Sequence, residues 1–263
     1  MEGFLAGAVP PPGLYVLEYA TAYSADSLRD NQGARVPLPT FGLHVRAAAT
    51  RIIWSTPQQL LGGNLVVHTI LPLLDLKVDV PGASQHRSGL GDITVGAGIA
   101  WHHSPKWHSV AALDFVLPTG SYDKNDAANL GRNYVSMQPL YAMSYIDPQG
   151  FNGDFMGTLS VNRKNDDTGY RSGDEFILDF ALGWGVGGGF TLGAGGYWYR
   201  QFSDDRLDGA AVPNARGRSF AIGPALRFDN GKGWFITAKW QRESAVRNRP
   251  EGSAFWIKSN IPF

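Results

Sequence analysis

The segment Phe176-Ile-Leu-Asp-Phe-Ala-Leu-Gly-Trp184 decides the fold class, because its side chains alternate between two kinds. Its even-numbered positions, from Phe176 to Trp184, are all large and apolar, whereas the odd-numbered ones include Asp179 and a glycine. A period of two residues is typical of a β-strand with one apolar face. The same alternation recurs at 93–101 and 220–228. We therefore predict an all-β protein.

The composition of the 263-residue chain excludes several functional classes. Its 23 Lys and Arg balance 23 Asp and Glu, so the basic charge that favours nucleic-acid binding is absent, and we expect no nucleic-acid partner. The chain has no cysteine, which removes disulfide frameworks, thiolate metal sites and cysteine nucleophiles. Its 33 glycines and 12 % aromatic residues favour β-structure over disorder.

Strand length separates a membrane barrel from a soluble β-sandwich, which also has one apolar face. Most predicted strands span about 10 to 16 residues, whereas soluble strands average five or six and tilted membrane strands need about 9–11. Long and short connections alternate, as expected for longer extracellular loops and short periplasmic turns. We predict a transmembrane antiparallel β-barrel of about twelve strands rather than a sandwich. The expected strands lie near residues 14–23, 40–55, 64–79, 90–102, 107–118, 134–145, 151–164, 174–185, 190–202, 218–228, 233–244 and 254–263.

Aromatic side chains support the barrel, because they gather at the predicted periplasmic strand ends, as at Trp54, Trp101 and Trp184. Such girdles mark the edges of the hydrocarbon. The final strand alternates and ends at Phe263, which resembles the signal read by the bacterial outer-membrane assembly machinery; an ordinary closing strand is the alternative. We expect location in the outer membrane of a Gram-negative bacterium, with that machinery, outer-membrane lipid and lipopolysaccharide as partners.

In two of the predicted strands the apolar positions change parity. The series from Leu43 to Ala49 gives way to Ile52, and a second series resumes at Leu74 after Pro72. We predict a β-bulge or kink at each change, because one extra residue would return the apolar face to the lipid.

Charged side chains fall mostly on the face opposite the apolar one, which we expect to line the lumen. An Arg or Lys exposed to lipid near the bilayer centre costs about 2–4 kcal/mol. Both signs of charge occur, which favours a structural network or a site for a polar solute over an ion-selective ring. The predicted lumen-lining residues are Glu18, His44, Arg46, His68, Asp75, Lys77, Asp92, Asp114, Asp154, Asp179, Arg227, Lys239 and Lys258.

The chain is expected to divide into an N-terminal periplasmic segment, residues 1–13, and the barrel, residues 14–263. The segment is apolar and contains three consecutive prolines. Two readings stay open, a simple periplasmic tail and a plug that folds into the lumen. The candidate plug residues are Phe4, Leu5, Val9, Pro10, Pro11 and Pro12.

Motifs for catalysis or cofactor binding are weak. Gly183-x-Gly185-x-x-Gly188 matches a dinucleotide-binding pattern, but a strand rather than a helix follows it. The histidines at 102, 103 and 108 have no partner at a recognised metal-ligand spacing. No Gly-x-Ser-x-Gly is present. We therefore expect neither an enzyme nor a cofactor or metal site; the alternative is a sealed outer-membrane barrel with a structural or lipid-hydrolysing role.

Several motifs, taken in order, resemble a known family. They are Gly89-Leu-Gly-Asp-Ile93, Leu117-Pro-Thr-Gly-Ser-Tyr-Asp123, Asn129-Leu-Gly-Arg-Asn133, Gly173-Asp-Glu175, Gly196-Tyr-Trp-Tyr-Arg-Gln-Phe-Ser-Asp-Asp205 and Ala221-Ile-Gly-Pro224. Over about residues 10–263 the chain resembles the proteins described as involved in the meta-pathway of phenol degradation. This resemblance implies a bacterial outer-membrane channel associated with the catabolism of aromatic or other hydrophobic compounds.

The family motifs concentrate at the predicted extracellular strand ends. Their polar residues either anchor loops that fold into the lumen, through charge-assisted hydrogen bonds, or only stabilise turns. If the loops fold inward, their apolar residues line an access path for an aromatic solute. The candidate loop and access-path residues are Leu117, Tyr122, Asp123, Leu130, Arg132, Asn133, Tyr134, Phe202, Asp204 and Asp205. We expect passive uptake of small hydrophobic or aromatic molecules.

Overall fold

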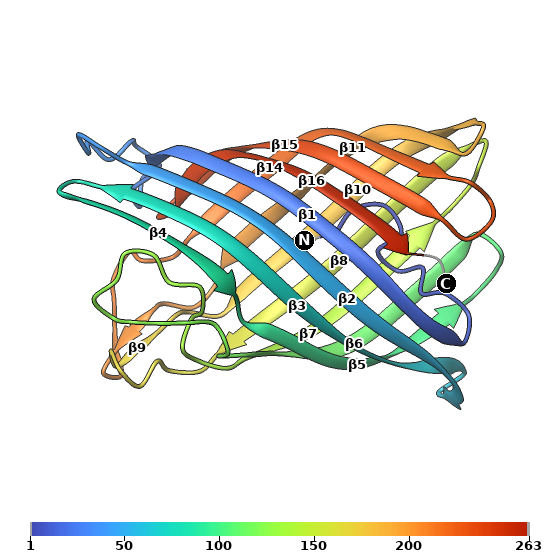
Figure 1. Cartoon of the computed structure of the whole chain (residues 1–263), viewed down its shortest axis with the longest axis horizontal. Coiled ribbons are helices and arrows are strands. Elements are labelled where there is room, and N and C mark those ends of the chain that lie inside the picture. The colour runs from blue at the N-terminus through green and yellow to red at the C-terminus, as the bar shows by residue number, and fades with distance from the viewer. Residues whose placement is uncertain (1, 262–263) are drawn as a thin grey trace.

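The computed structural model describes residues 2–261, which form a closed antiparallel β-barrel (Figure 1). The predicted twelve-stranded barrel is confirmed. Each strand pairs with the next along the wall, and β16 closes the barrel on β1. The wall strands are β1 (Gly13–Leu28), β2 (Gly42–Leu60), β3 (Gly63–Val80), β5 (Ile93–His102), β6 (Trp107–Leu117), β7 (Ser136–Tyr145), β8 (Phe151–Asn162), β10 (Glu175–Gly187), β11 (Phe190–Gln201), β14 (Arg218–Asp229), β15 (Phe235–Arg247) and β16 (Pro250–Ile261).

The extra strand β4 (Ala83–Leu90) extends the wall beside β3. The half of β3 near the extracellular side, residues 73–80, pairs with β4, and the half near the periplasmic side, residues 64–70, pairs with β5. We call these the upper and lower halves. Strand β6 ends at Leu117, so the edge of β4 that faces away from β3 has no strand partner. The loop 118–135 lies along this edge, and its Asp126 forms an ion pair with Arg87 of β4. The remaining short strands form a small sheet in the extracellular loops: β9 (Tyr170–Arg171), β12 (Arg206–Leu207) and β13 (Ala210–Ala211).

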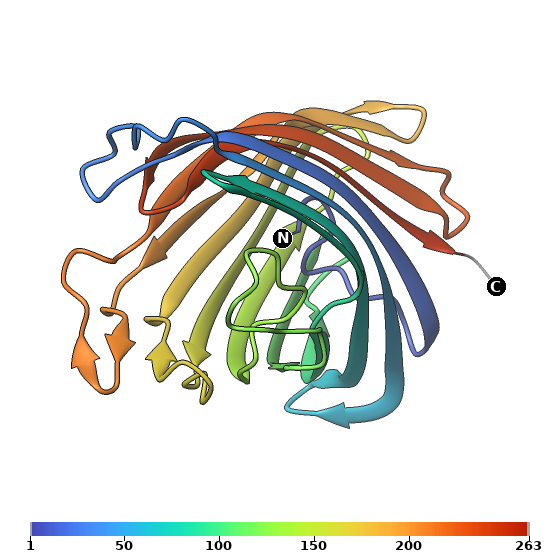
Figure 2. The same ribbon diagram turned by 60° about the vertical axis from the view of Figure 1, so that its left-hand side comes forward.

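The N-terminal segment identifies the inner face of the wall, because residues 2–12 lie inside the barrel (Figure 2). Glu2 contacts Tyr19 of β1, Arg51 of β2 and Lys258 of β16, so these three side chains point inward. Side chains alternate along a strand, and direct cross-strand partners share a face, so the registers assign the other positions. The outer face of β10–β16 is apolar, as the exposed Trp240 illustrates.

The upper halves of β2 and β3 reverse this polarity. Their register runs without a shift from Leu43 opposite Val78 to Ser55 opposite Val66. The bulge predicted within each strand is therefore wrong, and the apolar side chains change sides instead. The inward residues here are Leu43, Val45, Ala47, Leu74, Leu76 and Val78, and the outward ones include His44, Arg46, Asp75 and Lys77.

No helix among residues 2–261 is long and apolar enough to cross a membrane. Phe263, to which we assigned recognition by the assembly machinery, lies outside the described residues.

Candidate functional site

The candidate site is the lumen, and small side chains make room in it for the N-terminal segment. The inner positions of β10, β11 and β14 carry Ala181, Gly195 and Ala225. At Gly183 a Cβ atom would lie 2.7 Å from the carbonyl oxygen of Leu192 on the neighbouring strand and 2.9 Å from the ring of Phe4, so both the wall and the segment favour glycine there. Space left by small residues on one wall is thus occupied by residues 2–12.

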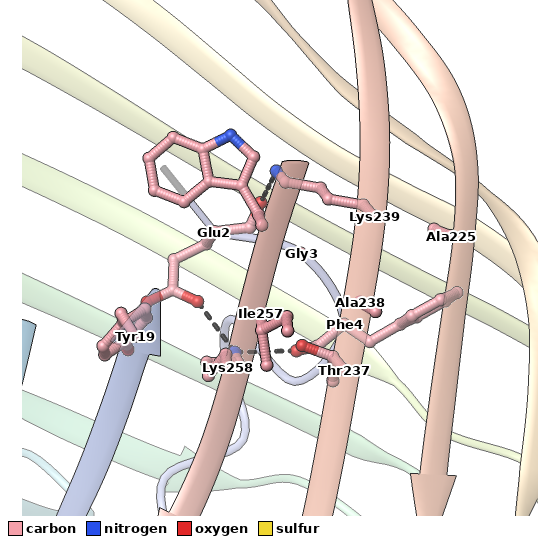
Figure 3. A pocket seen from close by; sticks show the side chains of 11 residues that line it. Glu2, Gly3, Phe4, Tyr19, Ala225, Thr237, Ala238, Lys239, Ile257 and Lys258 are labelled. Atoms are coloured by element: carbon pink, nitrogen blue, oxygen red, sulfur yellow. Dashed lines mark hydrogen bonds and ion pairs between the residues drawn. The ribbon is translucent and has the colours of Figure 1, made fainter. Parts of the chain in front are cut away.

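Glu2 is the polar anchor of the segment (Figure 3). Its carboxylate lies 2.8 Å from the Lys258 ammonium and 3.4 Å from the Arg51 guanidinium, and it accepts a hydrogen bond from the Tyr19 hydroxyl at 2.9 Å. Burial raises the pKa of Glu2, but the charges of Lys258 and Arg51 outweigh burial and lower that pKa to about 2. Glu2 is therefore ionised at neutral pH.

The backbone of the segment is held by two lysines from neighbouring strands. Lys258 donates to the carbonyl oxygen of Phe4 at 2.8 Å, and Lys239 donates to that of Glu2 at 2.5 Å. The Phe4 side chain is 1 % exposed and packs against Ala181 and Ala225. The cavity that remains around these groups measures about 20 Å³, which is room for one or two waters.

The second half of the segment binds the opposite wall. The amide of Ala6 donates to Asp154 at 3.1 Å, and the amide of Gly7 donates to the Ser144 hydroxyl at 2.8 Å. Gly7 passes so close to β7 that a Cβ atom would lie 2.7 Å from its backbone. Val9 packs on an apolar cluster at the periplasmic end of the lumen, formed by Ile53, Val66, Ala100, Val110 and Ala142. The segment therefore crosses the lumen from one wall to the other.

The remaining candidate plug residues carry the chain out of the lumen. Leu5 turns the backbone with a positive φ of 67° and packs beside Phe4. Pro10 is half-buried, whereas Pro11 and Pro12 are exposed. The Tyr15 hydroxyl donates to the carbonyl oxygen of Pro11 at 2.9 Å, which ties the exit to the start of β1.

The structure divides the predicted lumen-lining residues into two groups. Within the inward group, His68 and Asp114 form a buried pair at 2.9 Å between β3 and β6. Gly96 is required beside this pair, because a Cβ atom there would overlap the Asp114 carboxylate. The residues on the inner face are His68, Asp92, Asp114, Asp154, Asp179, Arg227, Lys239 and Lys258.

Five of the predicted lumen residues lie on the outer face, contrary to the prediction. Glu18 shares that face with Thr50, whose hydroxyl donates to its carboxylate at 2.9 Å. The prediction assumed that every charge avoids the outside. Near the extracellular surface of the membrane an outward charge reaches water or lipid headgroups at little cost, whereas Glu18, opposite Thr50, faces the lipid band, where a carboxylate costs less than Lys or Arg. The corrected residues are Glu18, His44, Arg46, Asp75 and Lys77.

Above the segment, the lumen has an apolar wall on the side of β2 and β3. Its inner surface consists of the side chains from Leu43 to Ala47 and from Leu74 to Val78 that face inward. Leu130, from the loop 118–135, is 7 % exposed, and a Cβ atom on Gly89 of β4 would lie 3.2 Å from it. The extracellular half of the lumen thus has its own apolar wall, whereas in the periplasmic half the N-terminal segment packs on the apolar cluster through Val9.

The loop 118–135 is anchored inside the barrel mouth. Asp92, between β4 and β5, accepts hydrogen bonds from the amides of Gly120 at 3.0 Å and Arg132 at 2.8 Å. Gln85 of β4 accepts from the amide of Ala128 at 2.8 Å, beside the Arg87–Asp126 pair. These bonds close the wall where β4 has no strand partner.

The other candidate loop residues have separate positions. Asp205 accepts hydrogen bonds from the Gly173 amide and Tyr170 hydroxyl, and Asp204 pairs with Arg216. The Arg216 guanidinium holds the pKa of Asp204 below its usual value. Leu117 faces outward on β6, and Phe202 is exposed. Asp123, Asn133 and Tyr134 make hydrogen bonds within and between the loops, and Tyr122 is half-buried in the loop 118–135.

Three functional contacts were not anticipated from the sequence: Glu2 with Lys258, Arg51 with Glu2, and Arg87 with Asp126. One signal was available, because Glu2 is the only charged side chain before Glu18. A lone charge in an apolar segment requires a partner if the segment is buried.

Comparisons with known proteins assign the family and agree with the fold. Residues 25–259 match the family described as "Putative MetA-pathway of phenol degradation". The chain belongs to this family. No protein with a curated description matches it in sequence. The predicted resemblance is thereby confirmed.

Among solved structures, the chain is similar to the COG4313 outer membrane channel from Pseudomonas putida F1, with 20 % identity, a TM-score of 0.85, and coverage of 98 % of this chain and 97 % of that one. It is also similar to the β domain of the Bordetella autotransporter BrkA, with 10 % identity, a TM-score of 0.56, and coverage of 97 % and 100 %. The NanC porin shares 10 % identity, with a TM-score of 0.50 and coverage of 94 % and 100 %. The fold is therefore that of outer-membrane β-barrels.

Proposed function

We propose that the protein is a passive channel in the bacterial outer membrane that takes up small hydrophobic or aromatic molecules. The observation that carries this proposal is the apolar inner surface of upper β2 and β3, which ordinary barrels place toward lipid. An apolar solute binds favourably to the apolar surface inside the mouth, because each Å² of apolar surface removed from water contributes about 25 cal/mol to the free energy of binding. Flux follows the concentration gradient, without a cofactor.

Residues 2–12 act in this proposal as the constriction of the channel. They bind both walls of the lower lumen through Glu2, Phe4, Ala6 and Gly7. The contacts are polar at both ends and apolar between them, so the segment can leave as a unit once its few anchors break. The apolar mouth then collects solute above a narrow, polar passage.

The alternative of a lipid-hydrolysing barrel has weaker support. A serine hydrolase needs a nucleophile beside a base that a third group orients. His103 lies 2.7 Å from the Ser109 hydroxyl, but Ser109 is 2 % exposed. The Ser24 hydroxyl also lies 3.0 Å from His44, on the outer face. Within residues 2–261, no carboxylate or amide side chain is hydrogen-bonded to the other ring nitrogen of His103 or His44. We therefore propose that the protein is not an enzyme.

Assembly belongs to the same proposal. The outer-membrane assembly machinery would recognise the final strand, and the mature barrel would contact outer-membrane lipid and lipopolysaccharide. A channel with this topology needs no further partner to conduct.

Single-channel recording in planar bilayers tests the proposal, combined with uptake of toluene by proteoliposomes whose outer leaflet is lipopolysaccharide, because toluene crosses a phospholipid bilayer without a channel. We expect steady conductance and saturable toluene uptake, both raised severalfold in a variant that lacks residues 2–12. Heat-modifiable migration in gels checks that the variant folds. Unchanged conductance in a folded variant contradicts the constriction, and uptake equal to that of empty liposomes contradicts the channel.

A further inference from the structure

Three arginines stand on the outer face of the wall at its extracellular end, and we call them the arginine cluster. Arg200 of β11 is the direct cross-strand partner of Arg218 of β14, and Arg218 is that of Arg247 of β15. Direct partners have Cβ atoms about 4.5–5.5 Å apart, and like charges in such pairs destabilise a sheet.

No carboxylate among residues 2–261 forms an ion pair with the arginine cluster. The acids nearby are engaged elsewhere. Glu243 points inward, where it accepts hydrogen bonds from Tyr23 and Tyr197. Glu251 pairs with Arg29 at 2.8 Å. Two adjacent like-charge pairs without a counter-ion indicate that the cluster meets an anion supplied from outside the chain.

The height of the cluster identifies the source of that anion. Phe190 and Phe228 pair at the periplasmic end of β11 and β14, and Arg200 and Arg218 pair at the other end. At about 3.3 Å per residue and a tilt of about 40°, the two rows lie about 25 Å apart along the barrel axis, which equals the apolar band of such barrels. The cluster therefore lies at the headgroup level of the outer leaflet.

The surface directly below the cluster is apolar. Trp198, Phe220 and Ile222 face outward within four residues of the arginines along β11 and β14. By contrast, the outward charges of β3 already have partners: Lys77 forms an ion pair with Asp79, and Asp75 is hydrogen-bonded to His86 of β4. Arg46 of β2 is a single outward cation, whereas adjacent outward arginines above an apolar surface, the arrangement that fits an anionic amphiphile, lie on the β11–β15 side.

We propose that the arginine cluster binds the phosphate groups of lipid A, the phosphorylated glycolipid of lipopolysaccharide, whose acyl chains lie over Trp198, Phe220 and Trp240. Guanidinium groups bind phosphate oxygens in bidentate geometry, and a phosphate between Arg200, Arg218 and Arg247 removes their mutual repulsion. This inference rests on the proposed outer-membrane location but is independent of conduction.

Binding of defined lipids to the purified full chain in detergent tests the proposal, measured by native mass spectrometry. We expect bisphosphorylated lipid A to bind about 100-fold more tightly than its dephosphorylated form, because two charge-assisted contacts are each worth about tenfold. The triple variant R200Q/R218Q/R247Q should lose that preference. The matched control is R216Q, whose guanidinium already pairs with Asp204.

A melting experiment provides a second readout. Lipid A should raise the Tm of the wild type but not that of the triple variant, because only a ligand of the folded state stabilises it. Equal binding of the two lipid A forms by the wild type contradicts the proposal even if the variant fails to fold. Equal binding of phosphatidylglycerol and lipid A contradicts the choice of lipid. Conductance measured in parallel separates either result from a failure of the channel proposal.

Discussion

Two parts of the barrel wall use the same alternation of side chains with opposite polarity. Along β11, β14 and β15 the outer face is apolar apart from the arginines of those strands, and the inner face is small or polar and supports the N-terminal segment. Along the upper halves of β2 and β3 the outer face is charged, and the inner face is leucine- and valine-rich. The difference shows that alternation identifies a strand. Whether its apolar side chains face the outside or the lumen depends on what surrounds each face of the barrel wall.

The height of the reversed region explains why its outward charges are tolerated. From Trp54, near the periplasmic end of β2, to Arg46 the strand rises about 20 Å along the barrel axis at about 3.3 Å per residue and a tilt of about 40°. Arg46 therefore lies near the upper edge of the apolar band, and the residues beyond it face headgroups or water. The reversal leaves the apolar surface inside, where a solute can use it.

The largest expected effect comes from a lysine placed on each wall. Ile222→Lys, outward on β14, should lower the free energy of unfolding by about 2–4 kcal/mol, because the ammonium would face lipid. Leu76→Lys, inward on β3, should lower it far less, because the lumen mouth is hydrated. Urea unfolding in lipid vesicles measures both. Equal costs at the two sites would refute the reversed polarity.

A second change should break the proposed role of the apolar inner wall. We expect Leu76→Asp to reduce toluene uptake about tenfold, as for the loss of about 1.4 kcal/mol of apolar contact. Conductance of small ions should stay within about twofold, because the lower lumen is unaltered. Lys77→Gln, the outward neighbour, is the control. Similar uptake by the two variants would argue against a route along this wall.

A third prediction concerns pH and the polar wall that holds the segment. The pKa of Glu2 is lowered from 4.5 to about 2, so ionisation stabilises docking above pH 4.5, and this contribution is lost only as the pH falls toward 2. Glu2→Gln removes the charge and should raise conductance severalfold between pH 7 and pH 5. Because Glu2 does not titrate in that range, the ratio of the variant's conductance to that of the wild type should stay constant there. A ratio that falls toward one near pH 5 would contradict the assignment.

The smallest expected effect lies at Glu18, the outward carboxylate beside Thr50. Glu18→Leu should raise the free energy of unfolding by about 1 kcal/mol or less, because a lipid-facing Asp or Glu costs less than Lys. Urea unfolding measures this change, with Tyr19→Phe as the inward neighbour for comparison. A clear loss of stability in Glu18→Leu would indicate a polar contact on the outer face that the strand register does not reveal.

The fold was largely predictable because strand periodicity and turn spacing are local properties. The expected strand near 190–202 is observed as Phe190–Gln201, and the one near 107–118 as Trp107–Leu117. The exception is β4, which the sequence pattern did not predict. The segment Ala83–Leu90 has little apolar alternation, so its sequence does not resemble a wall strand. It pairs with β3 alone.

The site was less predictable because its contacts join distant parts of the chain. Lys258 was assigned to the lumen from alternation alone, but its partner Glu2 lies at the other end of the sequence. Arg46 and Asp75 follow the same alternation and face outward. Odd and even sequence positions separate the two faces of a strand. They do not show which of the two faces lines the lumen of the barrel.

The sequence by itself determined that the chain forms long alternating strands, that these form a twelve-stranded barrel, and that the family is one linked to phenol degradation. Only the tertiary structure decided that residues 2–12 lie in the lumen, that upper β2 and β3 face their leucines inward, and that Arg200, Arg218 and Arg247 share one outward row. The physical reason is that strand formation depends on neighbours along the chain, whereas direction and charge pairing depend on barrel closure and on height in the membrane.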